Sequence, residues 1–286
     1  MKRLKEFLKT LIDIIWSKEM VHLPGSLAFF IVLSIFPVLT LIGYLASYFS
    51  VSVTGAVRVI SHALPSGVDN ILLPFVDGKI TRNALISIIF TFILASNGAH
   101  ALILASNSLY GIKNSSYLKR RVKALFLIIL MILLFIFMIA FLTYGNILYS
   151  LILSSVTYEP VNDVLYYIFT YIKWPIAMVI IFFIMRIVYM LSPDGKIPPK
   201  TTSRGAMFTT LGFTIATAIF SFYVANFSAY DIYYGSISTI VVLMMWVYII
   251  SYVIVIGIAI NVRSYNKYKA NIMNNVKKND NNINVL

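Results

Sequence analysis

Six long stretches of this sequence carry few or no charged residues, and each is long enough to cross a lipid bilayer as a helix. The hydrocarbon core of a bilayer is about 30 Å thick and takes roughly 20 apolar helical residues to span. The pattern predicts spans over residues 26–48, 84–110, 124–148, 164–191, 205–228 and 235–262. A transmembrane β-barrel needs segments of alternating polarity, whereas residues 124–140 are apolar on every face. We therefore expect an all-α polytopic membrane protein with six transmembrane helices.

The composition excludes a soluble globular domain. Charged residues make up 12% of the chain and hydrophobic residues 60%, whereas a soluble domain carries about 25% charge. The chain has no cysteine, so disulfides, thiolate metal sites and cysteine nucleophiles are excluded.

The basic residues predict the orientation in the membrane. Of the 23 lysines and arginines, 18 fall on one side of a six-span arrangement, and the opposite side has only Arg58, Lys79 and Arg82. The positive-inside rule places both termini in the cytoplasm. The net charge of +13 then indicates attraction to anionic inner-leaflet headgroups. It does not indicate nucleic-acid binding, because the basic residues are split among four short segments.

The two ends of the chain differ from the transmembrane domain, residues 21–263. Residues 1–20 have leucine and isoleucine on one helical face and lysine largely off it. This pattern predicts an amphipathic interfacial helix or, as an alternative, a helix packed on the cytoplasmic end of the bundle. Residues 264–286 are rich in asparagine and lysine, which predicts a disordered cytoplasmic tail.

Polar residues inside the spans are the first candidates for function, because burying them in lipid is costly. Two helical stripes stand out. One lies on the span 84–110 and comprises Asn97, His100 and Asn107. The other lies on the span 205–228 and comprises Thr210, Thr214 and Thr217. Each stripe predicts either a pathway for a substrate or ion, or hydrogen bonds between packed helices.

Two further groups of residues have two interpretations each. Lys173 and Arg186 are charges within a predicted span; they reach the headgroups by snorkelling or line a cavity. Asn226, Tyr230 and Asp231 at the outer turn between the last two spans serve a pathway or cap helix ends.

Pro37 differs from these groups because its effect is on the backbone. A proline inside a helix removes a backbone hydrogen bond, so Pro37 predicts a kink in the first span.

Enzyme signatures are missing from the sequence. It has no Walker A loop, dinucleotide fingerprint, HExxH or GxSxG motif. We therefore predict no catalytic residues, no metal and no cofactor, and any active transport would use an ion gradient or a partner rather than ATP bound by this chain.

Several short motifs resemble those of the YihY/BrkB family of inner-membrane proteins, which was formerly mislabelled ribonuclease BN. The similar segments are 25–30, 33–37, 107–110, 189–193 and 220–226, with Tyr230, 234–236, 246–248 and Gly257. The chain differs from the family pattern at Gly25, where alanine is usual, and at Ile260-Asn261, where an acidic residue and asparagine often stand. The resemblance implies six spans, a link to virulence, and in some members lipid or solute export.

The sequence and the resemblance lead to two hypotheses. The first is a transporter of a lipid or amphipathic solute, with membrane lipids as partners and no nucleic acid. The alternative is a non-transporting membrane scaffold or envelope-assembly factor associated with virulence. A membrane-bound nuclease is disfavoured, because the acidic residues are too scattered for a two-metal site.

Overall fold

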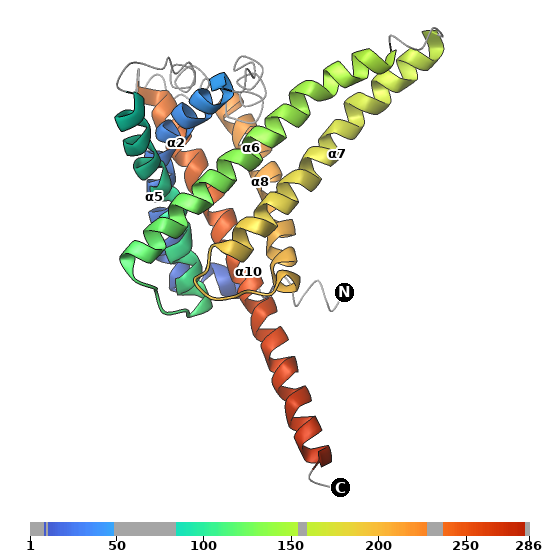
Figure 1. Ribbon diagram of the computed structural model, residues 1–286. Coiled ribbons are helices and arrows are strands. Elements are labelled where there is room, and N and C mark those ends of the chain that lie inside the picture. Colours follow the sequence, from blue (N-terminus) through green and yellow to red (C-terminus); the bar gives the residue numbers. More distant parts are fainter. Residues whose placement is uncertain (1–8, 10, 49–83, 154–158, 228–236, 284–286) are drawn as a thin grey trace.

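The computed structural model describes residues 9, 11–48, 84–153, 159–227 and 237–283, and within these ranges the long elements are all α-helices (Figure 1). The described ranges contain no strand, which confirms the all-α prediction, and each predicted span overlaps one helix. The helices are α2 (Glu19–Tyr48), α5 (Ala84–Tyr110), α6 (Tyr117–Leu153), α7 (Glu159–Leu191), α8 (Pro199–Phe227) and α10 (Ser238–Ile283).

Four of these helices are long and apolar enough, in the parts described, to cross a bilayer. The stretches are Glu19–Leu41, Ile89–Tyr110, Pro199–Val224 and Ser238–Asn275. In α7 the described apolar stretch is shorter, Pro175–Leu191. The number of six spans therefore stays a prediction.

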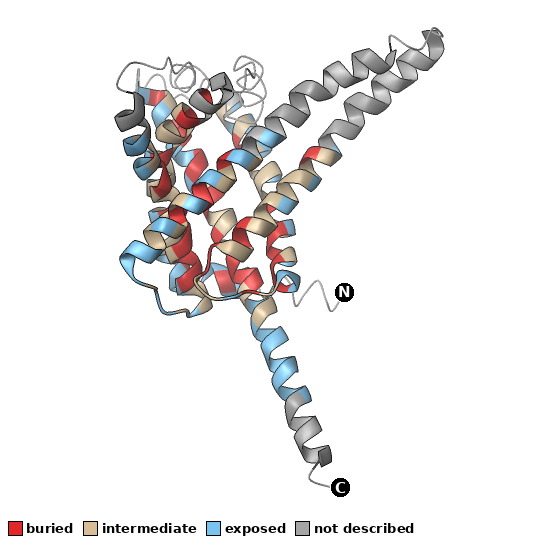
Figure 2. Ribbon diagram, in the orientation of Figure 1, coloured by how far each residue is buried: buried red, intermediate tan, exposed pale blue. Residues whose placement is uncertain are grey.

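The surface of the helix bundle is apolar as well as its interior. Buried residues face the centre of the bundle (Figure 2), while large side chains such as Phe29, Phe126, Phe183 and Ile219 are more than half exposed. A soluble protein rarely leaves so much contiguous apolar surface in water. The distribution fits helices that contact lipid tails on their outer faces.

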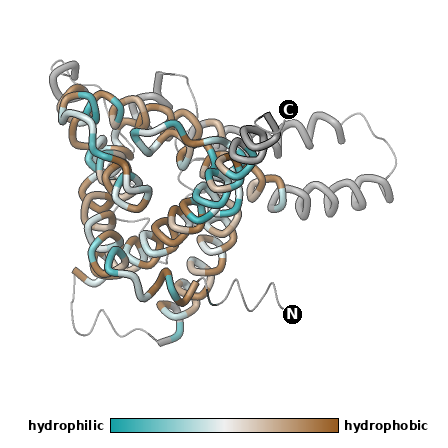
Figure 3. Tube along the Cα trace, turned by 90° about the horizontal axis from the view of Figure 1, so that it is seen from below, coloured by the Kyte–Doolittle hydropathy of each residue, from teal (hydrophilic) through white to brown (hydrophobic). Residues whose placement is uncertain are grey.

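The connections after α5 and α7 lie at the same end of the bundle as the start of α2 (Figure 1). Arg263 of α10 pairs with Asp13 at 3.5 Å, and the rings of Tyr110 and Tyr265 are 5.6 Å apart, so the middle of α10 belongs to this end too. Viewed from this side, hydrophilic segments are seen among mainly hydrophobic helices (Figure 3). We call it the basic end, after its lysines and arginines: Lys113, Lys119, Arg120, Arg121, Lys123, Lys196, Lys200, Arg204, Arg263 and Lys267.

Helix α10 differs from the expectation of a disordered tail over residues 264–286. It has 46 residues and continues to Ile283, which makes it about 69 Å long at the helical rise per residue. This is more than twice the thickness of a bilayer core, and its last part projects alone from the bundle (Figure 1). No proline or glycine follows Gly257, so the sequence contains no residue that would stop the helix.

Helices α8 and α10 approach closely because each has a glycine at the contact. A methyl group at Gly205 would overlap the carbonyl oxygen of Gly257, and one at Gly257 would overlap Oγ1 of Thr209. Small residues allow backbones to approach in this way within a membrane. The Oδ1 of Asn261 accepts the N–H of Gly205 at 2.7 Å, which ties the two helices together.

Tyr189 joins α7 to the same contact. It is 1% exposed, and its hydroxyl lies 2.6 Å from Oγ1 of Thr209 and donates to the carbonyl of Ile254 at 3.0 Å. A buried hydroxyl is costly without such partners, so Tyr189 fixes the position of α7 against α8 and α10.

The glycine contact generates a stability prediction. Gly257→Ala is expected to lower the free energy of unfolding by about 1–3 kcal/mol, because the added methyl group overpacks the contact between α8 and α10. Thermal unfolding of the purified protein in detergent measures the change. Gly25→Ala is the matched control, since its new methyl group would meet only Tyr248, at 3.8 Å. Equal unfolding temperatures for the two variants would contradict the prediction.

Candidate functional site

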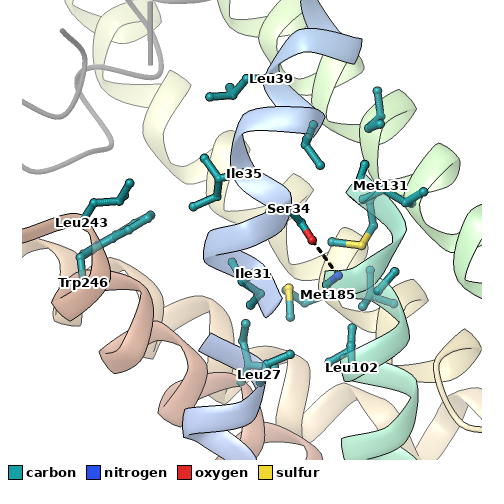
Figure 4. A pocket seen from close by; sticks show the side chains of 18 residues that line it. Leu27, Ile31, Ser34, Ile35, Leu39, Leu102, Met131, Met185, Leu243 and Trp246 are labelled. Atoms are coloured by element: carbon teal, nitrogen blue, oxygen red, sulfur yellow. Dashed lines mark hydrogen bonds between the residues drawn. The ribbon is translucent and has the colours of Figure 1, made fainter. Parts of the chain in front are cut away.

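A half-open cavity of about 350 Å³ lies between α2, α5, α6, α7 and α10 (Figure 4). Leu27, Ile31 and Ile35 of α2 line one side, and Met131 of α6 and Met185 of α7 line the other. Methionine side chains are flexible and adapt to irregular shapes. We call this space the central cavity.

The central cavity is apolar. Ser34 supplies a hydroxyl to its lining, but this hydroxyl already donates to the carbonyl of Phe30 at 2.7 Å and accepts the N–H of Gly98 at 2.8 Å. A cavity lined by aliphatic side chains favours a hydrocarbon chain over water or an ion.

The polar stripe on α5 faces away from the central cavity. Ala95, Gly98, Ala99 and Leu102 line the cavity, and at 100° per residue these positions lie on nearly the opposite face from Asn97, His100 and Asn107. The stripe therefore turns toward the start of α6 and the connections at the basic end.

Each residue of the α5 stripe has a neighbour on that side. Asn97 accepts a hydrogen bond from Arg121 at 2.9 Å, and the ring of His100 lies 6.0 Å from that of Tyr117 in an edge-on arrangement. The Nε2 of His100 is buried, with no hydrogen-bond partner among the described residues.

Asn107 takes part in the most connected polar group that the structure describes. Its amide donates to Asp194 Oδ2 at 2.9 Å and its Oδ1 accepts the Asp194 N–H at 2.7 Å. Asp194 also accepts the N–H of Ser115 at 3.0 Å and pairs with Lys123 at 3.1 Å, while Asn107 donates to Asn114 at 2.9 Å. We call these five residues the Asp194 cluster.

The Asp194 cluster joins three parts of the chain that are far apart in sequence: the end of α5, the start of α6 with the connection before it, and the connection after α7. The Lys123 ammonium group also donates to the carbonyl of Pro193 at 2.6 Å. Because charge-assisted bonds are stronger than neutral ones, the cluster holds these connections together at the basic end.

The threonine stripe on α8 forms bonds within its helix and to α10. Thr210 donates to the carbonyl of Ala206 at 2.9 Å, and Thr214 to that of Thr210 at 3.1 Å. Thr217 accepts from Nε1 of Trp246 at 3.2 Å. None of the residues that line the central cavity belongs to α8.

The other predicted residues lie away from the central cavity or outside the described part. Arg186 donates to the carbonyl of Pro199 at 3.4 Å, and the exposed Asn226 donates to that of Phe222 at 2.8 Å. The side chain of Lys173, and Tyr230 and Asp231 entirely, lie outside the described residues.

Pro37 lies within α2, which continues past it to Tyr48. The proline has no N–H, so the carbonyl of Leu33 loses its helical partner there; the predicted kink stays a prediction.

In the described ranges, no three histidine, aspartate or glutamate side chains gather as a metal site would require. The described residues offer two separate environments: an apolar cavity between the helices, and a polar cluster at the basic end.

The sequence analysis missed Asp194, although a signal was present. Asp194 is the only acidic residue between Asp163 and Asp231, and it lies in a Ser-Pro-Asp-Gly turn segment near Lys196, Lys200 and Arg204. An isolated acidic residue among basic residues indicates a structural ion pair. Its partners, however, come from distant parts of the chain, so their identity cannot be predicted from the spacing of residues in the sequence.

The surroundings of Asp194 stabilise its charged form. Burial of the carboxyl group raises the pKa, but hydrogen bonds from Ser115, Lys123 and Asn107 outweigh it and lower the pKa from 3.8 to about 2. The side chain of Asp194 is 9% exposed and that of Lys123 is 27% exposed, so the ion pair is partly shielded from solvent.

Replacing Asp194 tests the importance of the cluster. Asp194→Asn is expected to lower the free energy of unfolding by about 2–3 kcal/mol, because the partly buried Lys123 loses its ion pair. Asp13→Asn is the control, since the pair of Asp13 with Arg263 is about half exposed on both sides and such pairs contribute roughly 0–1 kcal/mol. Chemical unfolding in detergent compares them, and similar losses in both variants would refute a special role for Asp194.

The lowered pKa of Asp194 also predicts a pH dependence. Its contribution to stability is complete above the unfolded pKa of about 4 and is lost as the pH falls through about 2. The difference in unfolding temperature between the parent protein and Asp194→Asn should thus be constant near neutral pH and shrink below about pH 4. A difference that stays constant down to pH 2 would contradict the lowered pKa.

Comparisons with known proteins place the chain in one family. The family model described as "Virulence factor BrkB" matches residues 11–281. A ribonuclease-like protein of Bacillus subtilis, YfkH, is 28% identical over 250 residues, which cover 86% of this chain and 90% of that protein. A UPF0761 membrane protein of Vibrio atlanticus is 29% identical over 252 residues, which cover 82% of this chain and 74% of the relative.

No solved structure matches the chain. The family match over nearly the whole length is consistent with the apolar helices and with the motifs on α2, α5, α8 and α10. The chain belongs to the BrkB family of membrane proteins.

Proposed function

We infer that this membrane protein binds a lipid or amphipathic solute in the central cavity and moves it across the membrane. The observation that carries the proposal is the apolar lining of a space of about 350 Å³ within the bundle. This volume lies within the range of small-molecule sites, roughly 300–1,000 Å³. Its chemistry suits an acyl chain, and it has no charge to hold a free headgroup or ion.

The proposal includes six spans in a bacterial cytoplasmic membrane, with the basic end and both termini in the cytoplasm. The described connections that carry most lysines and arginines meet at one end of the bundle (Figure 1). Such an asymmetry favours the cytoplasmic side, where anionic headgroups are the expected lipid partners.

In this proposal the chain has no catalytic residues or cofactor, and transport is not driven by ATP bound to it. The sequence has no nucleotide-binding motif. The ribonuclease-like name belongs to the Bacillus subtilis relative, and the described residues of this chain provide no hydrolytic metal constellation in support of such an activity.

The alternative function is a scaffold or envelope-assembly factor, in keeping with the family description as a virulence factor. One observation favours it: Asn97, Asn107 and Thr217, which are candidates for a pathway, form hydrogen bonds to neighbouring helices or connections. In a scaffold these bonds hold the bundle together and nothing passes along them.

Filling the central cavity distinguishes the two functions. Ala95→Phe and Ala99→Phe place a ring in the cavity, since Ala95 and Ala99 line it and are at most 3% exposed. In proteoliposomes with a fluorescent phospholipid in the inner leaflet, the parent protein should expose the label to an added quencher, and both variants should lose most of this activity. The matched control is Ile89→Phe, on the outward face of the same helix and 62% exposed.

Unfolding temperatures and size-exclusion profiles confirm that the variants fold, and Ala99→Leu provides a smaller change if the phenylalanine variants do not. Label movement that is the same in empty liposomes and with the parent protein would favour the scaffold. Movement that persists in folded cavity variants would exclude the central cavity as the route.

A further inference from the structure

We propose that a groove between α8 and α10 at the basic end binds one anionic phospholipid from the cytoplasmic leaflet. The groove has a volume of about 570 Å³. Arg204 of α8 and Arg263 and Lys267 of α10 supply its cations, and Met207, Leu211 and Ile215 of α8 supply an apolar wall. We call it the lateral groove. None of its residues lines the central cavity. The inference rests on the proposed orientation, with the basic end in the cytoplasm, and is independent of whether the protein transports a lipid.

The order of residues along α8 separates the charged and apolar parts of the lateral groove. Arg204, Leu211 and Ile215 follow one another at helical spacing on one face, and the distance from Arg204 to Ile215 is about 16 Å at the helical rise. Arg204 lies near the start of α8, at the basic end, and Ile215 lies deeper in the bundle. A phospholipid has the same arrangement, with a phosphate at the interface and acyl chains below it.

The cations of the lateral groove are available to a ligand. Arg204 and Lys267 have no ion pair or hydrogen bond from their side chains within the described part of the chain. Among the residues that the structure describes, the ion-pair partner of Arg263 is Asp13 at 3.5 Å, and both side chains are about half exposed. This pair therefore contributes little and can open. Three cations around one groove leave a local positive charge that an anion would neutralise.

The apolar wall explains why the anion belongs to a lipid. Met207 is 60% exposed, Leu211 45% and Ile215 57%, so the wall faces outward rather than into the protein core. Inorganic phosphate would leave this wall unused, and a neutral lipid would leave the three cations uncompensated. Basic pockets between transmembrane helices on the cytoplasmic side are typical sites for anionic headgroups.

The test measures binding of defined lipids to the full-length protein in a neutral detergent by native mass spectrometry. The variant is the triple substitution Arg204→Gln, Arg263→Gln and Lys267→Gln, and the matched control is Lys113→Gln, Lys119→Gln and Lys196→Gln. The control residues are exposed lysines of the same end that lie outside the lateral groove, so both variants lose three charges. The probes are phosphatidylglycerol, phosphatidylcholine and inorganic phosphate.

We expect phosphatidylglycerol to bind the parent and control proteins at least about tenfold more tightly than the groove variant, because each lost cation weakens the attraction to the headgroup. Phosphatidylcholine should bind all three proteins equally weakly, and millimolar inorganic phosphate should not displace phosphatidylglycerol. Equal loss in both variants, equal binding of the two lipids, or displacement by phosphate alone would each overturn the proposal. The substituted side chains are exposed, and matching unfolding temperatures verify that the variants fold.

Discussion

Hydrocarbon offers no hydrogen bonds, so the polar groups between these helices depend on partners within the protein. The hydroxyl of Ser34 bonds to the backbone of α2 and α5, and that of Tyr189 lies between Thr209 and the carbonyl of Ile254. In each case a polar side chain that would be costly alone fixes one helix against another. The positions of the helices, and of the central cavity between them, follow from these bonds.

The lack of hydrogen-bonding partners in hydrocarbon also explains why the contacts at the basic end differ from those deeper in the bundle. Toward the basic end, charges are tolerated, and the Asp194 cluster uses an ion pair and several hydrogen bonds to join connections from distant parts of the chain. Deeper in the bundle, the space between α2, α5, α6, α7 and α10 is lined almost entirely by apolar side chains. The apolar cavity and the charged cluster thus lie at different levels of one bundle.

The sequence predicts the helices well because a membrane span has a strong local signal, a long run of apolar residues. It also predicts that Asn97, His100 and Asn107 share a face, since helical periodicity decides that. It cannot predict which face meets the cavity, because the central cavity depends on five helices that approach from different directions.

The length of α10 differs from the expectation of a disordered tail for another reason. Asparagine and lysine suggest disorder by composition, but no proline or glycine after Gly257 ends the helix.

Trp246 links the central cavity to the polar stripe of α8 that the sequence predicts. Its ring lines the central cavity, and its Nε1 donates to Thr217 in the polar stripe of α8 at 3.2 Å. The ring also lies 5.9 Å from that of Phe213, edge-on. One of the side chains that line the cavity is therefore oriented by a hydrogen bond to α8. Through Trp246 the threonine stripe contributes to the shape of the cavity without lining it, which gives these polar residues a role in either function.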